Sequence, residues 1–212
     1  MTATQKTVLV LLGCVALVFG LTINKVLSGK GQEDPAALLD AGIVMLQTPR
    51  PLPALELVDQ DGAPRRLDEL RDRWTLVFFG YSFCPDICPT TLAELRQLQG
   101  QLPQEARDNL RVVMVSVDPQ RDTPEQLKQY LGYFDAGFVG LTGELETIQH
   151  AANAMGVPFI PARGDTENYT VDHGGNLALV GPDGRQIGFI RAPLRTQKLQ
   201  GPLERMLVRK DS

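Results

Sequence analysis

The sequence predicts an α/β fold, a central mixed sheet flanked by helices. Two short runs, Trp74–Phe79 and Arg111–Val117, are mostly apolar, as expected of strands that are covered on both faces of a sheet. A segment with helical spacing of its apolar residues follows each of them. Two further strand-like segments and a last amphipathic helix come later. This β-β-α-β-α order, followed by β-β-α, is typical of an α/β domain.

Length and composition fit one such domain with an appendage. The chain has 212 residues, of which 43% are hydrophobic, and a formal net charge of −4. It contains no basic run, and acidic residues outnumber basic ones, so we expect no nucleic-acid partner. There are three cysteines, too few for a disulfide framework.

The N-terminus carries an apolar run, Thr7–Ile23, which is long enough to span a bilayer at roughly 17 to 20 residues. Asn24 follows directly, without a small-x-small cleavage site. The run Leu11-Leu12-Gly13-Cys14 faintly resembles a lipoprotein cleavage box, but the apolar stretch before it is short. We therefore predict an uncleaved membrane anchor over residues 1–27, with a cleaved signal peptide as the alternative.

Residues 28–51 are predicted to be a linker or arm. Ser28–Asp34 is polar, and Pro35–Leu46 is compatible with a short helix or an extended segment. Three prolines between residues 49 and 53 then stiffen the approach to the domain. The folded domain is predicted over residues 52–212.

The remaining elements follow from periodicity and from turn and cap residues. Thr123 before Pro124 marks a helix start, and Pro182-Asp183-Gly184 marks a hairpin turn. The expected strands are Leu55–Val58, Trp74–Phe79, Arg111–Val117, Val157–Ile160, Asn176–Val180 and Gln186–Arg191. The expected helices are a short turn at Leu67–Arg73, then Thr90–Leu102, Pro124–Phe134, Gly143–Met155 and Thr196–Val208.

Two cysteines lie four residues apart between a predicted strand and a predicted helix. If the helix starts near Cys84, the i,i+4 spacing puts the sulfurs of Cys84 and Cys88 on one face. The amides and dipole of a helix N-terminus favour thiolate over thiol. Two thiolates on one face can close a disulfide or hold a soft metal, and the spacing leaves both open.

The chain has two histidines. His150 lies in a predicted helix with no cysteine near it in sequence, so we interpret it as a solvated or packed helix residue. His173 lies between an extended segment and two glycines. It is the only candidate nitrogen ligand outside a helix interior.

Three motifs resemble the Sco/SenC family, thioredoxin-like copper proteins linked to assembly of cytochrome c oxidase. They are Gly80-Tyr81-Ser82-Phe83-Cys84-Pro85-Asp86-Ile87-Cys88-Pro89, Val117-Asp118-Pro119-Gln120-Arg121-Asp122-Thr123-Pro124 and Tyr169-Thr170-Val171-Asp172-His173. The resemblance covers about Leu52 to Val208 plus the N-terminal anchor. It implies a thioredoxin-like fold. The family usually has a serine after the histidine, where this chain has Gly174.

The resemblance implies that Cys84, Cys88 and His173 bind one copper ion. The ligand chemistry agrees, because two thiolates and an imidazole suit Cu(I) and, with an added ligand, Cu(II). A closed structural zinc site normally has four protein ligands. We interpret Asp86 and Asp172, which neighbour the ligands, as turn and cap residues rather than as groups that tune the metal. The methionines are interpreted as packing residues.

The resemblance further implies a copper chaperone anchored in a bacterial inner membrane, with its domain in the periplasm. It would take copper from an upstream periplasmic donor and deliver it to the binuclear copper site of cytochrome c oxidase subunit II. One alternative is an enzyme, a thiol-disulfide oxidoreductase that reduces the acceptor's cysteines with Cys84 and Cys88. Another is a redox or copper sensor. A peroxidase fits less well, because the Pro and Thr that precede a peroxidatic cysteine are absent.

Overall fold

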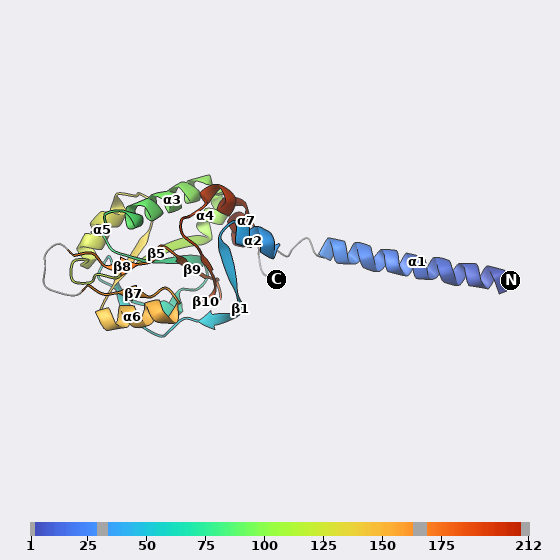
Figure 1. The fold of residues 1–212 in the computed structure, drawn as a ribbon, viewed down its shortest axis with the longest axis horizontal. Helices are drawn as coiled ribbons and strands as arrows, with labels where there is room; N and C mark the ends of the chain where they lie inside the picture. Colours follow the sequence, from blue (N-terminus) through green and yellow to red (C-terminus); the bar gives the residue numbers. More distant parts are fainter. Residues whose placement is uncertain (1–2, 29–33, 163–168, 209–212) are drawn as a thin grey trace. The chain divides into compact units, whose positions relative to one another are not determined.

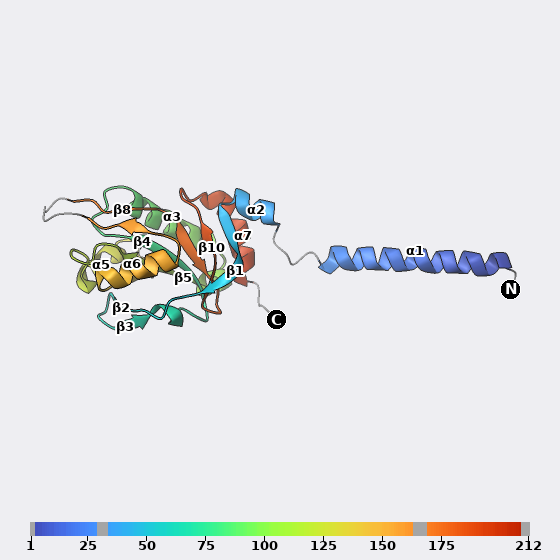
Figure 2. The same ribbon diagram turned by 60° about the horizontal axis from the view of Figure 1, so that its bottom comes forward.

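The computed structural model describes residues 3–28, 34–162 and 169–208. The chain divides into two compact units, Met1–Ala37 and Leu38–Ser212. The first contains α1 (Ala3–Ser28). No helix within the described ranges combines the length and apolarity that a membrane crossing requires. The second unit is the α/β domain, which Figures 1 and 2 show from two directions.

An eight-stranded mixed sheet forms the centre of the domain, in the order β1-β10-β9-β4-β5-β6-β2-β3. Its strands are β1 (Ile43–Pro51), β2 (Glu56–Asp59), β3 (Pro64–Arg66), β4 (Trp74–Gly80), β5 (Leu110–Ser116), β6 (Val139–Thr142), β9 (Leu177–Val180) and β10 (Arg185–Ile190). The pairs β4–β5 and β5–β6 are parallel, and the other pairs are antiparallel. Two short strands, β7 (Phe159–Ile160) and β8 (Asp172–His173), form a separate ribbon.

Helices cover both faces of this sheet. They are α2 (Pro35–Asp40), α3 (Ile87–Gln101), α4 (Gln104–Asp108), α5 (Pro124–Gly132), α6 (Leu145–Ala154) and α7 (Thr196–Val208), with a 3₁₀ turn at Leu67–Glu69. Figure 1 shows α3, α4 and α7 on one side of the strands and α6 on the other, and α3 and α4 both contact α7. The predicted mixed sheet flanked by helices is therefore confirmed.

Burial explains why the central strands could be predicted. In β4, every residue after Trp74 is buried, and β5 is buried apart from Arg111. A strand covered on both faces must be apolar throughout, which is the pattern that the sequence shows. The hairpin β9–β10 and the bounds of α7 also match the prediction.

The segment predicted as a linker is different in the structure. Residues 43–51 form β1, which pairs antiparallel with β10 at the edge of the sheet, and Ile43 is only 1% exposed. The prolines at positions 49 and 51 suggested a linker, but an edge strand tolerates proline on its unpaired side. The compact unit therefore begins at Leu38 and not at Leu52.

The start of α6 also differs from the prediction. The helix expected from Gly143 begins two residues later, at Leu145, with Glu144 as its N-cap residue. The sequence also predicts a polar loop over Pro161–Asn168, of which residues 163–168 lie outside the described ranges. By contrast, Thr123 is the N-cap of α5 as predicted, because its side chain accepts a hydrogen bond from the Gln126 N–H at 3.2 Å.

Candidate metal centre

The two cysteines and His173 come together at the carboxyl end of β4. Cys84 lies in the turn after this strand, Cys88 in the first turn of α3, and His173 on β8. The two sulfurs and a nitrogen of the imidazole ring all lie within 4.8 Å of one another. Residues about 85 positions apart in the sequence thus meet at a single point.

The cysteine pair is built differently from the i,i+4 helical pair that the spacing suggested. The helix α3 begins at Ile87, so Cys84 lies outside it, in a turn closed by a hydrogen bond from its N–H to the Tyr81 carbonyl. The sulfurs are still adjacent, because the Cys88 N–H donates to Cys84 Sγ at 3.5 Å. A free amide of the helix N-terminus therefore points at the Cys84 sulfur.

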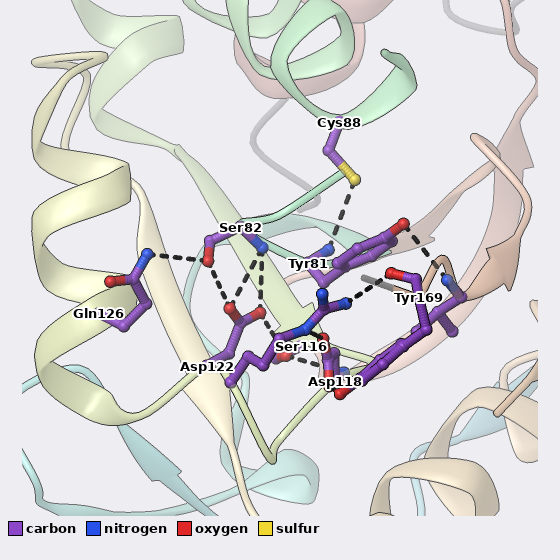
Figure 3. Close-up of polar contacts among 10 residues, drawn as sticks. Tyr81, Ser82, Cys88, Ser116, Asp118, Asp122, Gln126 and Tyr169 are labelled. Carbon is purple, nitrogen blue, oxygen red and sulfur yellow. Dashed lines mark hydrogen bonds and ion pairs between the residues drawn. The ribbon is translucent and has the colours of Figure 1, made fainter. Parts of the chain in front are cut away.

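A glycine makes room for the second sulfur. A Cβ atom on Gly80, the last residue of β4, would lie 2.8 Å from Cys88 Sγ and 2.6 Å from the Phe78 ring. Both of these side chains are fully buried. The Tyr81 N–H donates to Cys88 Sγ at 3.4 Å, as Figure 3 shows. The end of β4 thus both admits and orients the Cys88 sulfur.

The pKa of Cys88 is shifted in the direction opposite to the one expected for a thiol at a helix N-terminus. Cys88 is 0% exposed. Burial raises the pKa of its thiol, and the hydrogen bond from Tyr81 offsets only part of this effect. Because a metal binds the thiolate, metal binding at this site must release a proton from Cys88.

His173 is oriented by the backbone. Its Nδ1–H donates to the Val171 carbonyl at 2.9 Å, since a carbonyl oxygen can only accept. In the neutral ring, Nε2 then carries the lone pair, and it lies 3.1 Å from Cys88 Sγ. The ring also packs edge-on against Tyr81, with centroids 5.2 Å apart.

The residue after the histidine is not needed for this orientation. A Cβ atom placed on Gly174 would have nothing within 4 Å. A ligating histidine usually donates its second ring N–H to a carboxylate, a carbonyl or water, and Val171 fills that role here. The glycine in place of a serine therefore leaves the ligand correctly oriented.

The other candidate residues lie outside the cluster. Asp86 and Asp172 are exposed, and Asp86 is the N-cap residue of α3, without a hydrogen bond from its side chain to the helix. His150 is exposed on α6, as predicted. Of the methionines interpreted as packing residues, three are buried (Met114, Met155 and Met206), whereas Met45 on β1 is 42% exposed.

The structure adds a buried carboxylate that the sequence analysis did not single out. Asp122 is 0% exposed and accepts hydrogen bonds from the Ser82 N–H at 3.1 Å and from the Ser116 hydroxyl at 2.6 Å. The Ser82 hydroxyl also donates to it, at 2.5 Å, and accepts a hydrogen bond from Gln126 (Figure 3). Burial raises the pKa of Asp122. Asp122 thus fixes the start of the loop that carries Cys84.

A signal for this carboxylate was present in the sequence. Asp118 and Asp122 lie in the loop that follows a buried strand, at the edge of the sheet where α/β proteins commonly bind ligands. Turn and helix-cap chemistry also accounts for aspartates at these positions, so the sequence pattern alone did not show that Asp122 is buried beside the candidate centre.

The larger hollows of the domain lie away from this cluster. Two of them, with volumes of about 370 and 570 Å³, share Arg73 in their lining and contain none of the three candidate ligands. The candidate centre is instead a cluster of side chains, with both cysteines buried and His173 partly exposed.

Fold and site together define a class of protein: an α/β domain with a two-thiolate, one-imidazole site for a soft metal. The chain belongs to the SCO1/SenC family, whose model matches residues 46–207. It is 53% identical over 175 residues to a protein of Stutzerimonas stutzeri named as copper-binding, which covers 82% of this chain and 86% of the relative. It is also 33% identical over 152 residues to the mitochondrial SCO2 protein of Saccharomyces cerevisiae, covering 71% of this chain and 50% of the relative.

Solved structures agree with this assignment. ScoI of Bradyrhizobium japonicum with copper bound is 31% identical, with a TM-score of 0.64, and the match covers 75% of this chain and 98% of that one. The apo Sco1 protein of Thermus thermophilus is 33% identical, with a TM-score of 0.65, over 76% of this chain and 94% of that one. The predicted family is therefore confirmed.

Proposed function

We propose that this protein is a copper chaperone for cytochrome c oxidase assembly. It binds one copper ion through Cys84, Cys88 and His173 and passes the ion to the binuclear copper site of oxidase subunit II. The observation that carries the proposal is the convergence of three ligand atoms within 4.8 Å. Copper-bound relatives with the same fold support the choice of metal.

The donor set itself favours copper. Two soft sulfurs and one imidazole suit Cu(I) in a site with few ligands, and Cu(II) with one added ligand. Within the described residues, no fourth His, Cys, Asp or Glu joins the cluster, whereas a structural zinc site normally uses four. A site with three protein ligands also leaves room for an incoming ligand of the acceptor.

The surroundings of the site suit transfer to a partner. Phe83, next to Cys84, is 50% exposed, and His173 is partly exposed. An acceptor thiolate can therefore approach from the side of the Cys84 turn and of β8. Transfer then runs through shared-ligand intermediates, in which acceptor thiolates displace the donor ligands in turn.

Copper binding by the reduced protein tests the proposal. The wild type is expected to bind one equivalent of copper, and His173→Ala is expected to lose stable Cu(II) binding. His150→Ala is the matched control, because it removes the exposed histidine of α6 and leaves the cluster intact. Wild-type stoichiometry and absorption spectrum in His173→Ala would refute the ligand assignment.

A second candidate function is thiol-disulfide exchange by Cys84 and Cys88. The observation that favours it is the proximity of the two sulfurs, which are both reduced here. His173→Ala separates the two functions, because disulfide exchange does not need the imidazole. Cells that carry only this variant are expected to lose oxidase activity if copper delivery is the task. Full oxidase activity favours the reductase.

We further propose that the chain is anchored in the inner membrane, with the copper domain in the periplasm, where it receives copper from a periplasmic donor. The apolar run Thr7–Ile23 and the location of the acceptor site support this part of the proposal. An alkaline phosphatase fusion after Ala37 is expected to be active. An inactive fusion would place the domain in the cytoplasm. Release of the full chain from membranes by carbonate would argue against an anchor.

A further inference from the structure

Arg121 lies between the three segments that build the candidate centre. It belongs to the loop between β5 and α5, and its side chain is 20% exposed. Its guanidinium carbon lies 5.0 Å from the ring centroid of Phe83 and 5.6 Å from that of Tyr81, both in the loop that carries the cysteines. It lies closest to Tyr169, in the segment that carries His173.

The first anchor of Arg121 is a buried carboxylate. Asp118 is 3% exposed, and Arg121 Nε lies 2.5 Å from its Oδ2. The Tyr169 hydroxyl donates to Oδ1 of the same carboxylate at 2.6 Å. Because an ionised carboxylate is costly to bury without partners, Asp118 depends on these two donors. Figure 3 shows Tyr169 reaching Asp118 across the site.

Arg121 holds Tyr169 in two ways. Its guanidinium carbon lies 3.7 Å from the centroid of the tyrosine ring, well within the range of a cation–π contact. Its Nη2–H donates to the Tyr169 backbone carbonyl at 3.1 Å. A planar guanidinium can stack on a ring and donate in its own plane at the same time, which an ammonium cannot do.

Apolar packing between the same two segments is incomplete. A cavity of about 140 Å³ opens here. It is lined by Tyr169 and Val171, by the segment from Val117 to Gln120, and by Leu145, Pro161 and Ala162. At this gap, the contacts of Arg121 with Asp118 and Tyr169 join the two segments.

A short series of contacts leads from Tyr169 to the imidazole. Two residues after Tyr169, the Val171 N–H donates to the Tyr81 hydroxyl at 3.3 Å. The Val171 carbonyl in turn accepts from His173 Nδ1–H, the bond that orients the ring. A displacement of Tyr169 would move Val171 and, through its carbonyl, the ring of His173.

We propose that Arg121 is a positioning residue for the metal centre. By holding Tyr169 against Asp118, it keeps the segment Tyr169–His173 in place, so that His173 Nε2 faces Cys88. Its importance for copper rests on the proposed function, whereas the placement of the imidazole is a property of the metal-free protein. The two can therefore be tested separately.

The experiment compares Arg121→Met with Arg65→Met in the full chain. Arg65 is a matched control because it pairs with a similarly buried carboxylate, Asp59, which is 4% exposed, at 2.7 Å. It lies on β3, away from the site. Both variants remove the guanidinium partner of a buried aspartate. The side chain of Arg65 is 61% exposed and that of Arg121 is 20% exposed, so Arg121→Met is expected to cost more stability. Only Arg121→Met is expected to disturb His173.

The first readout uses the reduced, metal-free protein. Nitrogen NMR of the two imidazoles should show a slowly exchanging Nδ1–H for His173 in the wild type and in Arg65→Met, with His150 as the exposed reference. We expect Arg121→Met to lose this protection. The second readout is copper affinity measured by competition with a chelator, which we expect to fall about 10- to 100-fold in Arg121→Met, as for other residues that orient a ligand.

Arg121→Lys covers the case in which the methionine variant does not fold. A lysine keeps the charge next to Asp118 but loses the simultaneous stacking and carbonyl contact, so the His173 signal is expected to shift in a folded protein. Unchanged imidazole protection in both folded variants, or an equal loss in Arg65→Met, would overturn the positioning role. If the wild type bound no copper while Arg121→Met still lost the His173 protection, the proposed function would fail and the positioning role would stand.

Discussion

Gly80→Ala is expected to damage both the stability of the domain and its metal centre. The added methyl group would lie 2.8 Å from Cys88 Sγ and 2.6 and 2.9 Å from two carbons of the Phe78 ring. Ordinary contacts between carbon atoms are about 3.5–4.0 Å long, so the sulfur and the ring would both have to move by most of an ångström. Both side chains are fully buried, so neither can turn outward.

Overpacking of this kind typically costs about 1–3 kcal/mol. For a domain of this size, 1 kcal/mol corresponds to roughly 2–4 °C, so the expected fall in Tm is about 2–12 °C. Urea unfolding of the metal-free protein measures the free energy of unfolding. A copper titration of the same preparation measures the copper affinity, which displacement of Cys88 should lower. We expect both the stability and the copper affinity to decrease.

Gly174→Ala is the control for this prediction. It adds the same methyl group on the residue after His173, where nothing lies within 4 Å of the added Cβ atom. Its free energy of unfolding is expected to stay within about 0.5 kcal/mol of the wild type. If Gly80→Ala unfolded and bound copper like the wild type, the steric argument for the end of β4 would be wrong.

Three further predictions concern redox state, the domain boundary and pH. Oxidation of Cys84 and Cys88 to a disulfide removes two ligands, so a copper titration should show stoichiometric binding only for the reduced protein; equal tight binding by both forms contradicts this. Ile43→Ala is expected to lower the free energy of unfolding in urea by about 2–5 kcal/mol, because Ile43 is 1% exposed. Met45→Ala on the same strand should cost far less, because Met45 is 42% exposed. Equal small effects would mean that β1 is not part of the folded unit. Burial raises the pKa of Asp122 above its ordinary 3.8, so the folded protein holds that proton more tightly than the unfolded chain does. The stability of the wild type relative to Asp122→Asn should therefore fall as the pH rises from below 3.8 through the raised pKa. Urea unfolding measures this difference, and a relative stability that rises over the same interval contradicts the burial argument.

Local patterns were sufficient for much of the fold. The strand β4 could be predicted because burial on both faces makes it almost entirely apolar. The helix α7 could be predicted because its buried residues keep helical spacing across Pro202. The edge strand β1 could not, because its prolines are a linker signal unless the neighbouring β10 is already known. What decides that segment is pairing with residues about 140 positions away.

In the candidate site, too, some features were predictable from the sequence and others depend on the tertiary fold. The cysteine spacing left a disulfide and a metal site both open, and the resemblance to the Sco/SenC family implied that the cysteines and one loop histidine are the ligands. The contacts that orient them were not predictable. Asp122 reaches Ser82, and Arg121 reaches Tyr169, only through the tertiary fold. A carboxylate or a guanidinium in a loop looks the same in the sequence whether it is solvated or buried.

The three ligands are held with unequal firmness, and this bears on how copper would leave. Cys88 is 0% exposed, packed against Gly80 and raised in pKa by burial, whereas Cys84 lies in a turn outside the helix and is 7% exposed. An incoming thiol therefore reaches the Cys84 side first, and Cys88 should be the last sulfur to release the metal. Timed alkylation of Cys84 and Cys88 in the reduced, metal-free chain tests the order. Because only the thiolate reacts, Cys84 should be modified well before Cys88. Alkylation of Cys88 at the same rate as Cys84 would remove the structural basis for a fixed order of ligand exchange.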